Sequence, residues 1–424
     1  MVRRRIWFAL ALSLLFLVGH AIAGNPEVEI NLAQPLALEQ CIQLALEESS
    51  DMRNARRDFA IQNLRVKNAH AHYLPKILLN GRYSFSDRVD FGFKRRNYDL
   101  GLTGRYTLWD HGQREANYSQ AKERRNATES QNERIKQNLI FQITQAYYDV
   151  LKTQELVKVS KEILERSQEN TAATKVHVRV GNLIPADVAT SQVREANDEL
   201  NLLSNDNDLK IAKATLPRLM GLKPGMAIDL SKDTDYERYR ERGEIEVTEI
   251  SVEDAIQRAS ENRPEFKEVH SFLSQLESDL TLARLNRWPQ LNADLNYNVN
   301  LDDYLHEREN FGDFRSWDFT TRLNFPIFDG GVIRRQVREV ELLLEQTRED
   351  AKDLERSIAL EARQAYLNLK RAERAVEISG TQVRNAESSL EVIAGRFGQE
   401  LAFLLELLDA QTEFAQALTN QVRL

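Results

Sequence analysis

The segment QLNADLNYNVNL, residues 290–301, alternates strictly between two kinds of side chain. Its odd-numbered positions are apolar or aromatic, and its even-numbered positions are Gln, Asn or Asp. Successive side chains of a β-strand point to opposite faces, so the pattern predicts a strand with one apolar face and one polar face. The chain around this segment is highly charged and has helical periodicity, so the two faces of the strand need two different surroundings.

Three further segments, residues 76–86, 97–108 and 317–328, alternate in the same way. Aromatic residues gather at the ends of the four segments: Phe85, Tyr98, Trp109, Trp288, Trp317 and Phe328. About ten alternating residues with aromatic ends are typical of a membrane-spanning strand, with lipid on one face and water on the other. The alternative is an amphipathic sheet packed on a soluble core. The charged and amide side chains on the polar faces favour a water-filled lumen.

Four strands are too few to form a closed barrel. An open sheet edge cannot exist in the hydrocarbon of a membrane, because its backbone N–H and C=O groups would have no partner. The smallest usual barrels have about eight strands. A chain of this kind must therefore oligomerise if it spans a membrane, with eight strands in a dimer or twelve in a trimer.

The chain is an internal duplication. LEQCIQLAL at 38–46 is similar to VEDAIQRAS at 252–260, and WDHG at 109–112 is similar to FDGG at 328–331. A regular duplication means that both halves build the same structural unit. We predict a first repeat at 24–222, a linker at 223–250 and a second repeat at 251–424.

Each repeat is predicted to end in two helices. The first pair covers about 110–177 and 185–221, and the second pair about 331–397 and 403–424. Small and apolar residues recur at steps of three and four, which is the spacing of coiled coils. In the first long helix they are Leu139, Ile143, Ala146, Val150, Val157 and Leu164. In the second they include Ile358, Ala362, Leu369, Val383, Ala386, Leu390 and Ile393.

Short motifs mark the corners and turns of these helices. Asp110 and Asp329 follow the last strand of each repeat, where an aspartate is a natural N-cap. The glycines after them permit a tight turn, and they are Gly112, Gly330 and Gly331. Gly181 lies at the predicted turn between the first pair of helices, and the matching position in the second repeat is Glu400.

The N-terminus has the form of a secretory signal peptide. Arg3, Arg4 and Arg5 precede an apolar run at 6–18, and Ala21-Ile22-Ala23 is a small-residue cleavage site. The run is short for a membrane helix, so we expect cleavage after Ala23, which removes residues 1–23. The next residue is Gly24 rather than the cysteine of a lipoprotein, so we expect no lipid anchor.

Composition narrows the classes of partner and chemistry. The formal net charge of −8 argues against a nucleic-acid partner, and the single cysteine, Cys41, excludes an intrachain disulfide. The sequence contains no phosphate-binding glycine loop, nucleophile elbow or metal-ligand spacing. We therefore expect a protein that is not an enzyme and that needs no cofactor or metal.

At this point the chain resembles the TolC-like outer-membrane efflux proteins. The residues that carry the resemblance are FPIFDGG (325–331), TLWDHG (107–112), ELLDAQ (406–411) and ADVATSQ (186–192). The resemblance implies an α+β membrane protein that forms a homotrimer. Four strands from each chain would make a twelve-stranded barrel in the outer membrane, and the coiled-coil helices would continue it as a tunnel across the periplasm. The odd-numbered residues of 290–301 would face outer-membrane lipid, and the even-numbered residues would face the lumen.

The function implied is a passive export duct of a tripartite efflux or type I secretion system. Its partners would be a periplasmic adaptor (membrane fusion) protein and an inner-membrane pump of the RND, ABC or MFS type. The cargo would be small molecules or a secreted protein. The alternative is a periplasmic coiled-coil scaffold or adaptor that forms no channel.

The resemblance also implies where the narrowest part of the pore lies. It places Glu406 and Asp409 at the periplasmic helix tips, one helical turn apart, with Asp187 as the counterpart of Glu406 and with Phe397 nearby. Carboxylates repeated around a trimer would favour cations. The alternative is a set of solvated charges at helix starts, where acidic groups complement the helix dipole.

Overall fold

The structure is a computed structural model. It describes residues 35–88, 93–231, 250–300, 315–399 and 401–424. The expected signal peptide, most of the linker, Leu301 and Glu400 lie outside the described residues.

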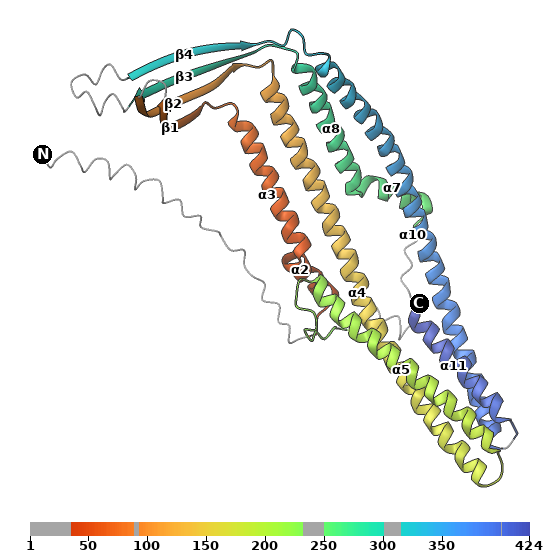
Figure 1. Cartoon of the computed structure of the whole chain (residues 1–424). Coiled ribbons are helices and arrows are strands. Elements are labelled where there is room, and N and C mark those ends of the chain that lie inside the picture. The colour runs from red at the N-terminus through yellow and green to blue at the C-terminus, as the bar shows by residue number, and fades with distance from the viewer. Residues whose placement is uncertain (1–34, 89–92, 232–249, 301–314, 400) are drawn as a thin grey trace.

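The two repeats contain the same elements in the same order, with strands at one end and helices running away from them (Figure 1). The first repeat contains α2 (Leu38–Glu48), α3 (Ser50–Ala71), β1 (Lys76–Arg88), β2 (Phe93–Trp109), α4 (Gln113–Arg179) and α5 (Pro185–Leu219). The second contains α7 (Val252–Asn262), α8 (Pro264–Leu285), β3 (Gln290–Asn300), β4 (Arg315–Asn324), α10 (Val332–Gly398) and α11 (Leu404–Arg423).

The strands form one antiparallel sheet in the order β1-β2-β3-β4, so the central pair joins the two repeats. Its register aligns apolar residues with apolar residues and polar residues with polar residues. Leu102 lies opposite Tyr297, which lies opposite Trp317 on the apolar face. Arg105 lies opposite Asp294 on the polar face. The alternation in the sequence therefore becomes two chemically distinct faces of one sheet.

The strand β4 is shorter than the alternating pattern predicts. It ends at Asn324, so the prediction that it continues to 328 is wrong for its last four residues. Pro326 has no N–H to donate to a neighbouring strand, which explains the early end. The side chains of Ile327 and Phe328 lie beyond the strand and are almost fully exposed in the single chain.

Helices α4 and α10 contain 67 residues each, which corresponds to about 100 Å at 1.5 Å per residue. The largest apolar core lies where α2, α3 and the end of α5 pack on α4, and it contains Cys41, Ile143, Tyr147, Leu216 and Met220. Burial raises the pKa of the Cys41 thiol to about 11, so this cysteine is a packing residue of the core. A second cluster joins α10 and α11 nearer the tips and contains Leu390, Leu407, Ala410 and Phe414.

The helix pair of the first repeat packs through hydroxyl groups below its core. The predicted stripe is confirmed at Leu139, Ile143 and Val150, which are buried, but Val157 is only half-buried. The buried positions toward the tip are instead Leu156, Val159, Ser160, Ser167, Thr171 and Thr174. A serine or threonine can be buried in a helix when it donates to its own backbone. Ser160 Oγ donates to the carbonyl of Leu156 at 2.8 Å.

None of the helices in the described part of the chain combines the length and the apolar character that a membrane crossing requires.

We predict that Gly221→Ala destabilises the protein far more than Gly225→Ala. Both glycines have left-handed backbone, with φ of +81° and +86°, so each alanine carries a cost of about 1–2 kcal/mol. A Cβ at Gly221 would also overlap the carbonyl of Glu48, whereas a Cβ at Gly225 meets nothing. The measurement is the thermal midpoint of the detergent-solubilised protein by circular dichroism. Equal decreases in the two variants would contradict the packing of α5 against the end of α2.

Candidate functional site: the pore-lining surfaces

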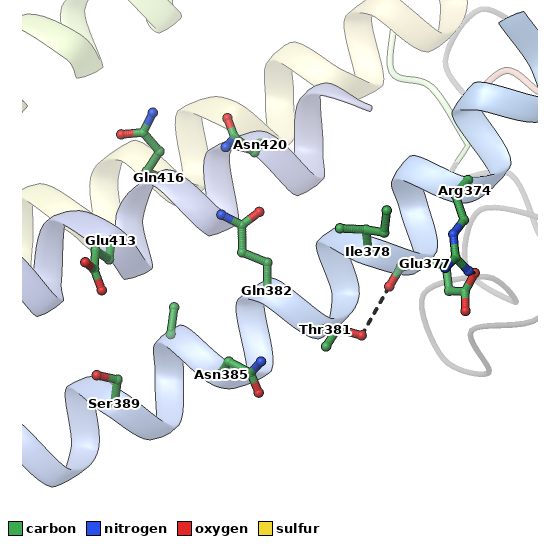
Figure 2. A pocket seen from close by; sticks show the side chains of 11 residues that line it. Arg374, Glu377, Ile378, Thr381, Gln382, Asn385, Ser389, Glu413, Gln416 and Asn420 are labelled. Carbon is green, nitrogen blue, oxygen red and sulfur yellow. Dashed lines mark hydrogen bonds and ion pairs between the residues drawn. The ribbon is translucent and has the colours of Figure 1, made fainter.

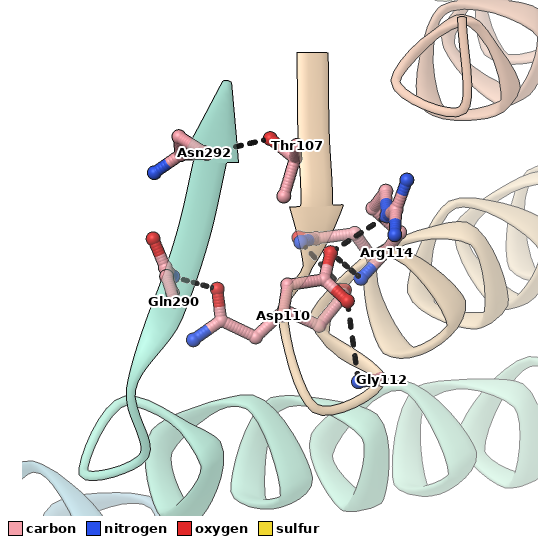
Figure 3. A network of polar contacts seen from close by, with 8 residues as sticks. Thr107, Asp110, Gly112, Arg114, Gln290 and Asn292 are labelled. Atoms are coloured by element: carbon pink, nitrogen blue, oxygen red, sulfur yellow. Dashed lines mark hydrogen bonds and ion pairs between the residues drawn. The ribbon is translucent and has the colours of Figure 1, made fainter. Parts of the chain in front are cut away.

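The polar face of the sheet carries a network of side chains that links neighbouring strands. Asp294 on β3 lies between Arg105 Nε at 3.6 Å and Arg322 Nη1 at 3.9 Å. Thr107 Oγ1 donates to Asn292 Oδ1 at 2.9 Å, as Figure 3 shows. These contacts satisfy polar groups within the face and leave it open to water.

The opposite face of the sheet is apolar and uncovered in the single chain. Its side chains include Ile77, Leu79, Leu295, Phe319, Leu323 and Trp317, and Trp317 is 72% exposed. A large exposed apolar patch marks a surface for a partner or for lipid. This face has the chemistry of a lipid contact, and the polar face has the chemistry of a wet lumen.

The first strand-to-helix corner is held by Asp110. Its carboxylate accepts the backbone N–H groups of Gly112 and Arg114, both at 3.3 Å, and the Arg114 Nε–H at 2.8 Å (Figure 3). Gly112, with φ of +89°, is the residue at the N-cap position of α4. The prediction that Asp110 is the N-cap is therefore wrong by two positions. The left-handed glycine turns the chain so that an upstream carboxylate reaches the first turn of the helix.

The second corner repeats this arrangement. Asp329 accepts the N–H groups of Gly331 and Ile333, both at 2.8 Å. Gly331 is the N-cap of α10, so the N-cap prediction for Asp329 is wrong by the same shift. Gly330 and Gly331 have φ of +63° and +81°. The N–H groups of Ile333 and Gly331 lower the pKa of the Asp329 carboxyl because they stabilise its charged form.

His111 is a corner residue that the sequence analysis missed. Among the described residues it alone has positive φ, +54°, without being glycine. Its ring lies 3.6 Å from the Trp109 ring and 4.8 Å from the Trp288 ring, measured between centroids. The rings are tilted at 47° and 38° to that of His111, and these contacts tie the first corner to the residues before β3. The second repeat has Gly330 at this position. A histidine that matches a turn glycine was the feature of the sequence that could have indicated its special role.

The helix tips contain the predicted aperture residues. Gly181 has φ of +86° in the turn between α4 and α5, as expected of a glycine there. Asp187 lies in the first turn of α5, where its carboxylate accepts the Ile184 N–H at 3.0 Å. Glu406 and Asp409 lie in successive turns of α11 and are exposed, while Leu407 between them is buried.

Contacts near the tips join the two repeats. The Phe397 ring lies 5.7 Å from the His177 ring in an edge-to-face arrangement. Asn170 Nδ2 lies 2.6 Å from Gln411 Oε1, and the Arg166 guanidinium lies over the Phe414 ring. The structure therefore brings Phe397 of the second repeat to the tip of the first repeat.

An open groove of about 930 Å³ separates α10 from α11 above their apolar cluster, as Figure 2 shows. Its lining is mostly polar and includes Gln382, Asn385, Ser389, Glu413, Gln416 and Asn420. Across the described ranges, no three His, Cys, Asp or Glu residues lie close enough together to hold a metal ion.

Comparison with known proteins gives a consistent family. A family model described as "Outer membrane efflux protein" matches residues 41–222 and 255–424. Nodulation protein T of Rhizobium leguminosarum bv. trifolii is 22% identical over 91% of this chain and 78% of its own length. Outer membrane protein TolC of Vibrio cholerae is 23% identical over 86% of this chain and 81% of its own length.

The fold is also that of a solved channel. The Campylobacter jejuni CmeC outer membrane channel superposes with a TM-score of 0.75 at 17% identity, over 91% of this chain and 82% of CmeC. Such structural relatives are trimeric channels in which a barrel is continued by a helical tunnel. The fold class predicted from the sequence is confirmed.

We predict that Asp329→Ala lowers the thermal midpoint near pH 7 and has a smaller effect at about pH 3. Because the folded pKa is lowered, the carboxylate stabilises the fold above its unfolded-state pKa of about 3.9, and this contribution is lost as pH falls through the lowered value. The matched control is Asp353→Ala within α10, where an exposed pair with Arg356 contributes little. An Asp329→Ala effect that is unchanged by pH would contradict capping by the carboxylate.

Proposed function

The chain belongs to the outer membrane efflux protein family, and on that premise we propose that it is a passive export duct across the outer membrane and periplasm. In this proposal the pump supplies the energy and the chain supplies the path. The cargo leaves the cell through a lumen lined by the polar face of the sheet.

The observation that carries the proposal is the two-faced sheet with its bare apolar side. Strands β1 and β4 are at its edges, and each has a neighbour on only one side within the chain. In lipid both edges need partners, so β1 of one chain pairs with β4 of the next. Three chains close a barrel of twelve strands. A periplasmic scaffold has no use for an uncovered face containing Ile77, Phe319 and Trp317.

The partners follow from the family. Channels of this family are homotrimers that work with adaptor proteins and inner-membrane pumps. We propose that a periplasmic adaptor contacts the helix tips, where α4 meets α5 and α10 meets α11. The pump can be of the RND, ABC or MFS type. We also propose that the chain reaches the outer membrane through cleavage of its signal peptide after Ala23 and without a lipid anchor.

We propose that the aperture is formed by Glu406 and Asp409. Both carboxylates are exposed on α11, on the side away from its buried residues. Three-fold repetition would place six carboxylates around the axis, which favours cations. Asp187 has a different role in this proposal, because its carboxylate caps α5 through the Ile184 N–H.

We predict that the purified protein gives discrete, cation-preferring steps in a planar bilayer. The double variant Glu406→Gln with Asp409→Asn should lower the cation-to-anion permeability ratio by at least about twofold, the effect of one unit charge about 10 Å away in water. Asp187→Asn is the matched control, because its amide oxygen can still accept the Ile184 N–H. Heat-modifiable trimer bands from outer-membrane fractions establish the oligomer.

If the double variant conducts with the same cation-to-anion permeability ratio as the wild type, the proposed duct stands and the assignment of the aperture to Glu406 and Asp409 is refuted. A protein that neither forms trimers nor inserts into the bilayer would refute the duct itself and favour the scaffold.

A further inference from the structure

Basic residues are concentrated at one end of the polar face of the sheet. Lys76 is the first residue of β1, directly after the helical part, and Arg105 and Arg322 lie close to the ends of β2 and β4. Asp294 lies near the start of β3. In an antiparallel sheet these positions all fall at the end nearest the helices, where Figure 1 shows the strands meeting α4 and α10.

The register makes these residues immediate neighbours. Lys76 lies opposite Arg105, and Arg105 lies opposite Asp294. Arg322 lies two residues along β4 from Thr320, the register partner of Asp294, and reaches the same carboxylate. Arg105 and Arg322 therefore share the Asp294 carboxylate, and Lys76 lies beside Arg105. We call Lys76, Arg105, Asp294 and Arg322 the basic band. Its net charge is two positive units per chain.

The exposure of these side chains shows which charges remain available to a ligand. The Asp294 side chain is only 17% exposed, whereas those of Arg105 and Arg322 are 66% and 63% exposed. The carboxylate is thus enclosed and orients the two guanidinium groups, which project from the face. A guanidinium held in this way keeps N–H donors free for a second oxyanion.

The acidic residues at the two corners do not neutralise the positive charge of the basic band, because each has other partners. At the corners, Asp110 is bound by Arg114, and Asp329 is directed at backbone N–H groups. Farther along the polar face, the described charged side chains are Arg82, Asp99 and Asp318, one base and two acids. Among the side chains that the structure describes on this face, the net positive charge therefore lies at the end of the sheet that adjoins the helices.

We propose that the basic band is an anion-selecting ring in the lumen, at the junction of the helical tunnel and the barrel, and that it favours cargo with carboxylate or phosphate groups. This inference rests on the proposed duct, in which the polar face lines the lumen and three copies carry six net positive charges. A confined ring of one sign raises the local concentration of the opposite ion. The duct then has an acidic aperture at the tips and a basic ring near the membrane.

The test is the reversal potential of the trimer in a planar bilayer, under a gradient of potassium chloride and then of potassium glutamate as the carboxylate probe. Arg105→Gln with Arg322→Gln should raise the cation-to-anion permeability ratio at least about twofold. Asp294→Asn should lower it, because removing the shared acid makes the band more positive. Arg53→Gln is the matched control, since Arg53 pairs with Glu48 and lies on α3, roughly 30 Å from the sheet.

Two further variants distinguish a change in charge from a failure of the double glutamine variant to assemble. They are Lys76→Gln and the charge-retaining double variant Arg105→Lys with Arg322→Lys. The first should raise the permeability ratio, and the second should leave it close to wild type. Conducting trimers whose ratio is the same in wild type, in Lys76→Gln and in Asp294→Asn would overturn the basic band and leave the duct intact. Absence of conductance in inserted wild-type trimers would instead count against the duct.

Discussion

A β-strand in hydrocarbon cannot leave backbone N–H and C=O groups without partners, and the architecture of this chain depends on that constraint. The sheet has β1 at one edge and β4 at the other, so no single copy satisfies it. Oligomerisation is therefore required for the sheet to exist in a membrane at all. The apolar residues around Trp317 provide the surface that lipid covers once the edges are paired.

The two repeats have the same plan but differ where they meet their surroundings. At the first corner a histidine ring contacts two tryptophan rings, and at the second a glycine takes a left-handed backbone conformation without a side chain. Toward the tips, α4 and α5 pack through hydroxyl groups, whereas α10 and α11 meet through Leu390, Leu407 and Phe414. Duplication thus gave the chain one scaffold with two sets of contacts.

Much of this fold could be predicted from the sequence, because a period of two residues is unambiguous over ten positions. The faces of β3 followed directly from residues 290–301. The stripe on α4 failed beyond Val150, because buried serines and threonines such as Thr171 look polar in a sequence. The N-cap prediction for Asp110 is wrong because the sequence does not show how far a carboxylate reaches across a left-handed glycine. That reach depends on three-dimensional geometry. The proposed aperture at Glu406 and Asp409 depends on subunit contacts that one chain does not contain.

The pairing of β2 with β3 has a consequence for how the protein is made. Thr107 and Asn292 touch across this pair although they are 185 positions apart in the chain. Closing such a loop is entropically costly, and folds dominated by distant contacts form slowly. The central β2–β3 pair therefore cannot form until the second repeat has been synthesised. During that interval the apolar side chains of β1 and β2 lack the neighbours that β3 and β4 provide in the finished sheet.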